Sequence, residues 1–346
     1  MDFNFLINRW SILFLIIVTC VFYQTSASAE SCHRNADNKI IVADTTGTPV
    51  SHDSGSNYNQ DSCNEEPLFY KVKIFEVMMC ASDPFVAGSG DTGSDPDFTS
   101  CTNLFTNSSG KDIEITPNVK TDLFDGSVTL PLGNFPYSVI IVSNHLKIKH
   151  YETYIDTGDN DADIRGYGAS DFSSGKTCWT HEGFTTYTGY STSMHGKTIL
   201  STSAGTSNSL GLICGDTFDA DSTSTYEYTT EILDSIDATC DASNDCDTTF
   251  RPYVGYQANS EIDGSYAGVL LQNDRRTVGS NRDNSTTVAY IINFNNPLII
   301  TEDVKTFEML FDTKSSVSID WGAAASVTNA VKMGVDPFKV KYTISN

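Results

Sequence analysis

Basic residues are scarce in this chain. It has 21 Lys and Arg against 44 Asp and Glu, a net charge of −23. A surface with this balance repels nucleic acid and anionic membranes, so we expect neither as a partner. The acidic excess favours cation binding or life in a saline exterior, and its simpler interpretation is a solvated surface.

Signatures of catalysis are mostly absent. The sequence contains no Gly-x-Ser-x-Gly elbow, no His-Glu-x-x-His motif and no phosphate-binding glycine loop. Carboxylates are too numerous for any pair to be singled out, so glycan hydrolysis stays an alternative. An enzyme that works through a free thiol is disfavoured, because every cysteine after the N-terminal segment can be paired. We therefore expect a protein that acts by binding and not by catalysis.

Long apolar runs are missing beyond the N-terminus. Arg9 precedes an apolar run of about a dozen residues at 11–22, and Ala27-Ser28-Ala29 resembles a cleavage site, which predicts a signal peptide at 1–29. A second reading makes Cys20 a lipidated cysteine, although Thr19 stands where such signals usually carry a smaller residue. No later segment is long and apolar enough to span a membrane. The predicted location is extracellular, cell-surface or periplasmic.

Cysteine usage agrees with export. Eight cysteines follow the predicted signal peptide, an even number that suggests up to four disulfides. Each bond between sequence neighbours would close a loop rich in Ser, Gly and Asp, and would stabilise the fold by about 2–4 kcal/mol. The predicted pairs are Cys32–Cys63, Cys80–Cys101, Cys178–Cys214 and Cys240–Cys246.

Strong helix formers are few, whereas Thr, Ser, Asn, Gly and Tyr are abundant. Alternating segments such as 70–77 and 338–344 predict an all-β fold: an antiparallel β-sandwich, one large or two packed, with long disulfide-pinned loops. The single helix candidate is 226–237, where Tyr228, Ile232 and Ile236 recur at four-residue spacing. Asn295-Asn296-Pro297 predicts a turn between two strands. The predicted organisation is a signal peptide at 1–29, an N-terminal arm at 30–66, a β-sandwich at 67–155, a loop and hairpin insertion at 156–225, and a second sheet region at 226–346 that either packs with 67–155 as one domain or stands apart.

The stretch 125–144 organises the chain. Val128 and Leu130 alternate with polar residues, a Pro-Leu-Gly turn follows at 131–133, and 139–142 is a continuous apolar run. Residues 121–143 resemble the "dG…f…LppGxYxvxv" signature of transthyretin-like and Cna-B-type β-sandwich modules. Leu132 replaces the second proline of that signature, and three residues intervene before Tyr137. The resemblance implies a stalk or accessory module of a surface protein.

A calcium site is the sharpest local signal. Asp156, Asp159, Asp161 and Asp163 lie in one short turn, and alternating carboxylates can converge on a hard cation. The match to an EF-hand-like loop then fails, because Ile164 stands at the glycine position and Ser170 at the glutamate position. Glu152 or Asp171 could complete the site. A weaker cluster comprises Asp241, Asp245 and Asp247, and a plain solvated turn is the alternative for both.

Two further groups could bind a ligand. His145, Lys147, Lys149 and Tyr151 share one face of a strand by period two, and this basic stripe suits an anionic ligand or the acidic face of another subunit; a solvated sheet face is the alternative. Aromatic residues follow Cys178 in a Thr/Gly-rich segment and could stack on sugar rings, or could serve only to pack a small hairpin. They are Trp179, Tyr187 and Tyr190, accompanied by His181 and His195 as weak metal-ligand candidates.

These observations support three hypotheses. The first is an exported, disulfide-stabilised β-sandwich that binds or assembles with other protein subunits at the cell surface or in an appendage. The second is a secreted protein that binds or degrades surface glycans. The third is a calcium-dependent adhesin.

Overall fold

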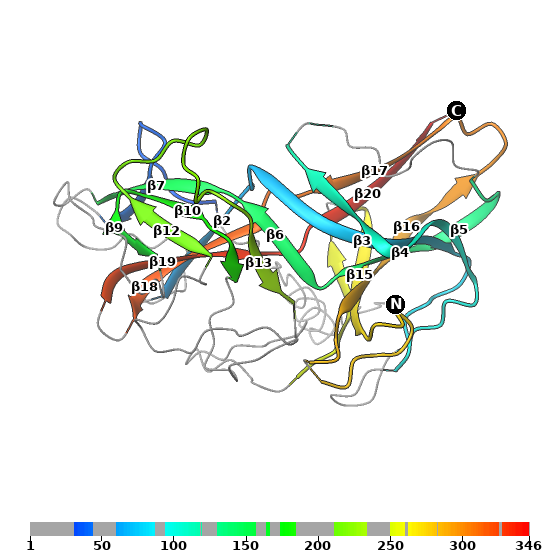
Figure 1. Cartoon of the computed structure of the whole chain (residues 1–346). Helices are drawn as coiled ribbons and strands as arrows, with labels where there is room; N and C mark the ends of the chain where they lie inside the picture. Colours follow the sequence, from blue (N-terminus) through cyan, green and yellow to red (C-terminus); the bar gives the residue numbers. More distant parts are fainter. Residues whose placement is uncertain are drawn as a thin grey trace, which may run out of the picture.

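The computed structural model describes residues 31–43, 60–86, 94–117, 119, 130–156, 164–166, 174–184, 211–233, 250–259, 262–281, 283–324 and 327–345. Every regular element in these ranges is a β-strand, which confirms the all-β prediction (Figure 1). The strands are β1 (Ile40–Ala43), β2 (Gln60–Glu65), β3 (Phe69–Cys80), β4 (Cys101–Ile115), β5 (Gly133–Ser143), β6 (His145–Lys149), β7 (Tyr151–Asp156), β8 (Ile164–Gly166), β9 (Ser174–Gly175), β10 (Thr177–Thr180), β11 (Gly183–Phe184), β12 (Leu212–Gly215), β13 (Thr229–Ile232), β14 (Tyr253–Asn259), β15 (Gly264–Leu271), β16 (Thr287–Ile300), β17 (Thr306–Asp312), β18 (Val317–Ala324), β19 (Val327–Val335) and β20 (Lys339–Ser345).

The largest sheet has nine strands and is built around β3. Its order is β11-β13-β6-β3-β5-β16-β15-β14. Strands β5 and β6 pair with the same edge of β3, and β4 pairs with the opposite edge. Apolar side chains cover both faces: Ile74, Val77 and Met79 belong to one buried cluster, whereas Met78 and Cys80 belong to the other. Burial on both faces accounts for the continuous apolar run at 77–80, whereas the alternation at 70–74 reflects one buried and one more open face.

Strands β5 and β6 run along the same edge of β3 as one bent line. Val142 lies opposite Ile74 and Lys147 lies opposite Lys71, so five residue steps on one side span three on the other. This irregularity bends the line at Asn144 and separates two parts of the sheet. We call β5, β16, β15 and β14 the long-strand wing, and β6, β13 and β11 the short-strand wing.

Asn144 joins the two wings. Its side chain is fully buried, and its amide nitrogen Nδ2 donates hydrogen bonds to the carbonyl oxygens of Leu233 (3.2 Å) and Ser285 (2.8 Å). The first acceptor follows β13 and the second precedes β16. The backbone adds bonds from Leu233 N to Asn144 O and from Asn144 N to Thr286 O. One residue at the bend therefore holds both strands that diverge from it.

Smaller sheets pack around this core (Figure 1). The ribbon of β17 and β20 contributes Phe338, whose ring centroid lies 5.7 Å from that of Tyr70 of the main sheet. A four-stranded sheet, β1-β7-β10-β12, continues from β6, because only His150 separates β6 from β7. A five-stranded sheet, β2-β18-β19-β8-β9, adjoins the short-strand wing, where Glu231 of β13 accepts a hydrogen bond from Val335 N.

Three disulfides hold the chain. They join Cys32 to Cys63, Cys80 to Cys101, and Cys178 to Cys214. All three link the cysteine neighbours that the sequence order predicts. The fourth predicted pair, Cys240 and Cys246, lies outside the described residues.

Two local predictions were wrong. The helix expected at 226–237 is replaced over its described part by β13, which pairs antiparallel with β6. The turn expected at 295–297 is instead a bulge within β16, between Asn293 and Leu298. There Asn295 and Asn296 donate side-chain hydrogen bonds to Asp263, and a bulge tolerates Pro297, which has no N–H.

Regions 67–155 and 226–346 share one sheet, because β5 pairs with β16 along its length. Within residues 121–143, which carry the transthyretin-like resemblance, β5 is described, whereas 121–129 lie outside the described ranges. Across the described residues, no helix has the length and apolarity needed to cross a membrane.

Candidate functional site

The predicted basic stripe lies on the open face of β6. His145, Lys147 and Lys149 are half-buried, whereas Leu146 and Ile148 between them face the core. The strand register adds a fourth basic residue that the sequence pattern did not predict for this face. Lys71 of β3 lies directly opposite Lys147. Cationic side chains from two strands therefore meet on one face.

Two lysines of this face lie over tyrosine rings. The Nζ atom of Lys71 lies 4.0 Å from the ring centroid of Tyr228, and that of Lys149 lies 4.4 Å from the ring centroid of Tyr226. A cation over an aromatic face at this distance is stabilised by about 0.5–2 kcal/mol. We call Lys71, Lys147, Lys149, Tyr226 and Tyr228 the lysine–tyrosine face.

Charge on this face is only partly neutralised. Lys71 pairs with Glu114 of β4 at 3.6 Å, and the Tyr228 hydroxyl donates a hydrogen bond to the same carboxylate. Burial, reinforced by Glu114, raises the pKa of Tyr228 well above its ordinary value, so this hydroxyl stays protonated. Within the described residues the ammonium group of Lys147 forms no ion pair, although it lies beside Lys71. Like charges on directly opposed residues repel, and a bound anion would relieve that repulsion.

Trp179 is placed for packing. It is 6% exposed, its ring stacks on Phe218 at a centroid distance of 5.0 Å, and its Nε1 donates a hydrogen bond to Thr225 (3.1 Å). Tyr151, predicted to extend the basic stripe, joins the same aromatic cluster at 4.6 Å from Phe218. These rings are occupied by one another, which favours the packing interpretation over sugar stacking. Tyr187, Tyr190 and His195 lie outside the described residues, and His181 Nδ1 lies 3.0 Å from the carbonyl oxygen of Thr225.

The calcium prediction stays a prediction. Asp156 is the last residue of β7, whereas Asp159, Asp161 and Asp163 lie outside the described ranges, as do Asp171, Asp241, Asp245 and Asp247. In the ranges that are described, no group of three potential metal ligands occurs. Glu152 is unsuited to complete such a site, because both of its oxygens bind Arg34, at 2.7 and 2.8 Å.

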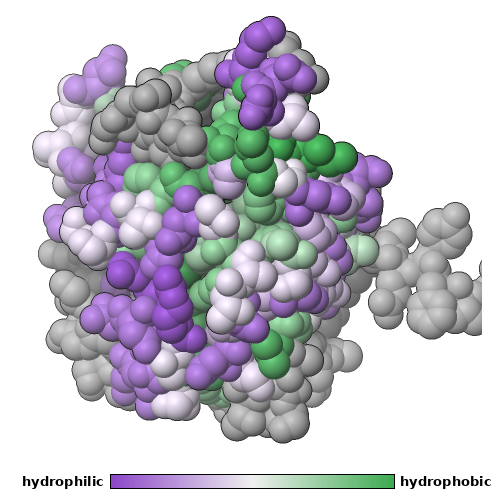
Figure 2. All heavy atoms as spheres, turned by 90° about the vertical axis from the view of Figure 1, so that its right-hand side faces the viewer, coloured by the Kyte–Doolittle hydropathy of each residue, from purple (hydrophilic) through white to green (hydrophobic). Residues whose placement is uncertain are grey.

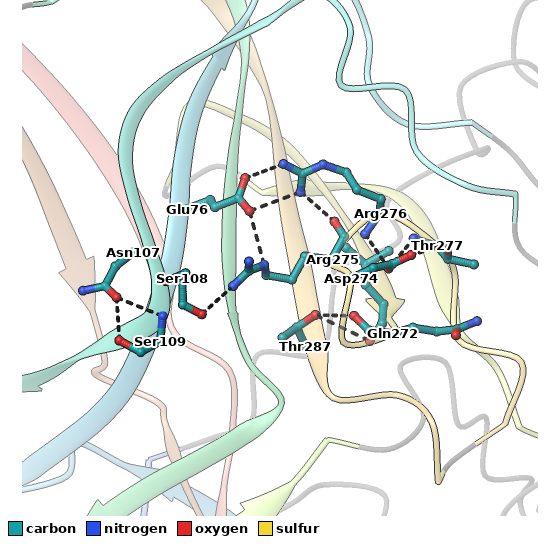
Figure 3. A network of polar contacts seen from close by, with 11 residues as sticks. Glu76, Asn107, Ser108, Ser109, Gln272, Asp274, Arg275, Arg276, Thr277 and Thr287 are labelled. Atoms are coloured by element: carbon teal, nitrogen blue, oxygen red, sulfur yellow. Dashed lines mark hydrogen bonds and ion pairs between the residues drawn. The ribbon is translucent and has the colours of Figure 1, made fainter.

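Sequence reasoning missed the burial and the arginine partners of two carboxylates, Glu152 and Glu76. Glu152 is 7% exposed and, besides Arg34, contacts His150 Nε2 at 3.0 Å. Burial alone would raise the pKa of Glu152, but the hydrogen bonds and charges of His150 and Arg34 outweigh it and lower that pKa. Glu76 of β3 is 3% exposed and is bound by two arginines (Figure 3). The available signal for Glu76 was a charged residue directly before the apolar run at 77–80 of β3.

The Glu76 network is a structural clamp. Arg276 Nη2 lies 2.7 Å from Glu76 Oε2, and Arg275 Nε lies 3.3 Å from Oε1. Arg275 also donates a hydrogen bond to the carbonyl oxygen of Ser108 in a bulge of β4 (3.1 Å). Figure 3 shows both guanidinium groups converging on the carboxylate from a single turn. Because Glu76 is buried and both of its oxygens are bound by arginines, we assign this network to packing and take the lysine–tyrosine face as the candidate site.

Six large apolar side chains are exposed among the described residues, and two of them lie at the ends of neighbouring strands. Leu132 and Ile299 are 59% and 58% exposed where β5 begins and β16 ends. Figure 2, which views the right-hand end of Figure 1, shows apolar residues there among hydrophilic ones. Scattered exposed apolar side chains are normal on monomeric proteins, so we assign no site to them.

Comparison of the chain with protein-family models, with curated proteins and with solved structures finds no match.

Proposed function

We propose that this protein is an exported binding subunit that docks the acidic surface of another protein subunit on its lysine–tyrosine face. The observation that carries the proposal is Lys147, which lies opposite Lys71 in the strand register and forms no ion pair with any described residue, in a chain of net charge −23. Complementary charge steers association and fixes register between partners.

The two tyrosines of this face also favour binding of a partner. Their rings already hold Lys71 and Lys149 in place, so a partner loses less side-chain entropy than it would with free lysines. A second copy of this chain presents an acidic surface of the required sign. Docking of one patch onto a different patch of the next copy is a heterologous contact, which extends into rings or filaments.

The setting fits export. Three disulfides persist only where the environment is oxidising, outside most cytosols. The glycan-binding alternative is weakened because Trp179, its central residue, is buried. The calcium-dependent alternative depends on aspartates outside the described ranges.

Sedimentation velocity tests the proposal on the mature chain. We expect concentration-dependent association near 0.15 M salt, where a screening length of about 8 Å suppresses the long-range repulsion between two copies of net charge −23. Association should weaken towards 1 M, where the screening length falls to about 3 Å. Lys147→Glu should abolish it. The matched control is Lys305→Glu, an exposed lysine beside β17 that changes net charge equally. Both variants should keep the wild-type melting temperature, since surface changes stay within about 0.5 kcal/mol.

Two outcomes would count against the proposal. A wild type that stays monomeric at every salt concentration contradicts assembly between copies. Equal association of Lys147→Glu and wild type removes the face as its cause. A monomer that binds a sulfated polysaccharide through Lys147 would instead move the face to the carbohydrate-binding hypothesis.

A further inference from the structure

A modification signal lies in the bulge of β4. Residues 107–109 read Asn-Ser-Ser, an Asn-x-Ser/Thr acceptor sequence for N-glycosylation, and residues 284–286 read Asn-Ser-Thr, a second one. This motif is short and recurs by chance, so its surroundings must decide whether it is used. The two copies differ sharply in structure.

Asn107 is half-buried and lies between exposed neighbours. Its Oδ1 accepts hydrogen bonds from Ser109 N (3.1 Å) and Ser109 Oγ (2.9 Å), so the acceptor oxygen and the motif hydroxyl are already bound together. Its Nδ2, the atom that is glycosylated, has no partner among the described residues. Figure 3 shows this nitrogen pointing away from the Glu76 network. Ser108 and Ser109 are exposed.

The bulge that carries Asn107 is held firmly. Thr106 pairs with Glu76 and Lys111 with Ile74, so residues 107–110 have no partners in β3. Gly110 has φ +77°, and a Cβ there would lie 2.5 Å from Lys73 Cγ. Arg275, which also contacts Glu76, donates a hydrogen bond to the carbonyl oxygen of Ser108. The backbone geometry at the acceptor is therefore set by packing.

Asn284 is locked by contrast. Its Oδ1 accepts hydrogen bonds from Ser280 N and Asn281 N, and its Nδ2 donates one to Ser280 Oγ at 2.8 Å. The middle residue of its motif, Ser285, is fully buried and donates a hydrogen bond to Asn281 O. Modification of Asn284 would require this turn to open.

We propose that Asn107 carries an N-linked glycan beside the edge of β4 that faces away from β3. Among the described residues β4 pairs only with β3, so no described strand covers the second edge of this 15-residue strand. An open edge of this length invites pairing with another chain, and a bulky hydrophilic group on it prevents such pairing. The lysine–tyrosine face meets β4 at Glu114, seven residues along the strand from Asn107, where Glu114 pairs with Lys71.

The modification needs a lipid-pyrophosphate-linked oligosaccharide and its transferase. Asn107 Nδ2 attacks the anomeric carbon C1 of the oligosaccharide. The N–C1 bond forms, the C1–O bond to phosphate breaks, and the lipid pyrophosphate leaves with the electron pair. The amide proton passes to a carboxylate base of the transferase. The proposal rests on the exported location in the proposed function.

The test secretes the full mature chain behind a heterologous signal peptide, in a host that modifies Asn-x-Ser/Thr sequences. Because the foreign signal peptide exports the chain in every case, the test of glycosylation does not depend on whether the chain's own N-terminal segment directs export. We expect peptide-N-glycosidase to increase the protein's mobility and to convert Asn107, and not Asn284, to Asp in the peptide mass spectrum. Asn107→Gln and Ser109→Ala should both lose the mobility shift. Ser108→Ala, which keeps the motif, and Asn284→Gln should retain it.

A secreted wild type without a glycan, or with its glycan on Asn284, would overturn the assignment. Light scattering at high concentration tests the edge-covering role separately. Asn107→Gln should self-associate faster than glycosylated Ser108→Ala at the high salt that suppresses charge-driven docking. Equal rates would overturn that role.

Discussion

The two wings each border a buried carboxylate, and they neutralise it in different ways. Glu76, at the long-strand wing, is bound by Arg275 and Arg276, which are consecutive residues of one turn. Glu152, beside the short-strand wing, is bound by Arg34, which lies 118 residues away in the sequence, and by its near neighbour His150. Both carboxylates are compensated, as burial of a charge demands.

The difference lies in what positions the arginines. In the first case a local turn does so: Asp274 accepts hydrogen bonds from the backbone of Arg276 and Thr277, and Arg275 adopts φ +61°. In the second case the N-terminal arm does so, and the Cys32–Cys63 bond holds that arm against β2. The long-strand wing is thus stabilised by packing and turn geometry, and the region around the short-strand wing depends more on covalent and long-range contacts.

Removal of Glu76 should have the largest effect. Glu76→Ala leaves two arginines against an apolar sheet face, and loss of one partner of a buried ion pair costs about 3–5 kcal/mol. Urea denaturation monitored by circular dichroism measures this. The control is Asp112→Ala, whose carboxylate is 63% exposed and lies 3.9 Å from Lys73; it should cost at most about 1 kcal/mol. Equal losses would show that the Glu76 clamp is no stronger than a surface pair.

Disulfide removal should rank second. Replacement of Cys178 and Cys214 by Ser should reduce the free energy of unfolding by about 2–4 kcal/mol. The Cys80–Cys101 bond closes a shorter loop, with a sequence separation of 21 against 36 residues. The chain-entropy model therefore predicts that its removal reduces the free energy of unfolding by about 0.5 kcal/mol less. Parallel urea titrations compare the two. The reverse order would mean that native contacts, not loop length, set each contribution.

Asn144→Ala should separate the wings at moderate cost. Two buried carbonyl oxygens lose their donor, which costs about 1–3 kcal/mol. The two tryptophans after residue 29, Trp179 and Trp321, lie in sheets next to the short-strand wing, so fluorescence follows that region while circular dichroism follows all strands. We expect the two unfolding curves to coincide in wild type and to diverge in the variant. Asn295→Ala, in an exposed bulge, should keep them together.

The smallest effect should be a pH dependence of the Glu152 region. Its pKa is lowered on folding from an ordinary value of about 4.5, so its contribution to stability is present above that value and is lost as pH falls through the lowered pKa. Glu152→Gln should therefore show a smaller drop in melting temperature than wild type between pH 7 and about pH 3. Parallel curves would show that Glu152 does not contribute to acid sensitivity.

Local patterns predicted much of the fold. Alternation identified β3, β6 and β20, because the period of two is a property of a single strand. Cysteine order predicted the three described disulfides, because each closes between neighbours. The helix expected at 226–237 failed, because β6 offers β13 an edge to pair with, and tertiary pairing overrides a four-residue spacing. On the candidate site, Lys147 and Lys149 were predicted, whereas Lys71, Tyr226 and Tyr228 were not.

The sequence by itself determined an acidic, disulfide-bonded, all-β chain, because composition, cysteine order and strand period are local quantities. Only the tertiary structure decided that Lys71 faces Lys147, that Asn144 joins two diverging strands, and that Glu76 meets arginines 200 residues away. These contacts depend on which strands pair and in which register. Register is a property of two segments together, and neither segment's sequence contains it alone.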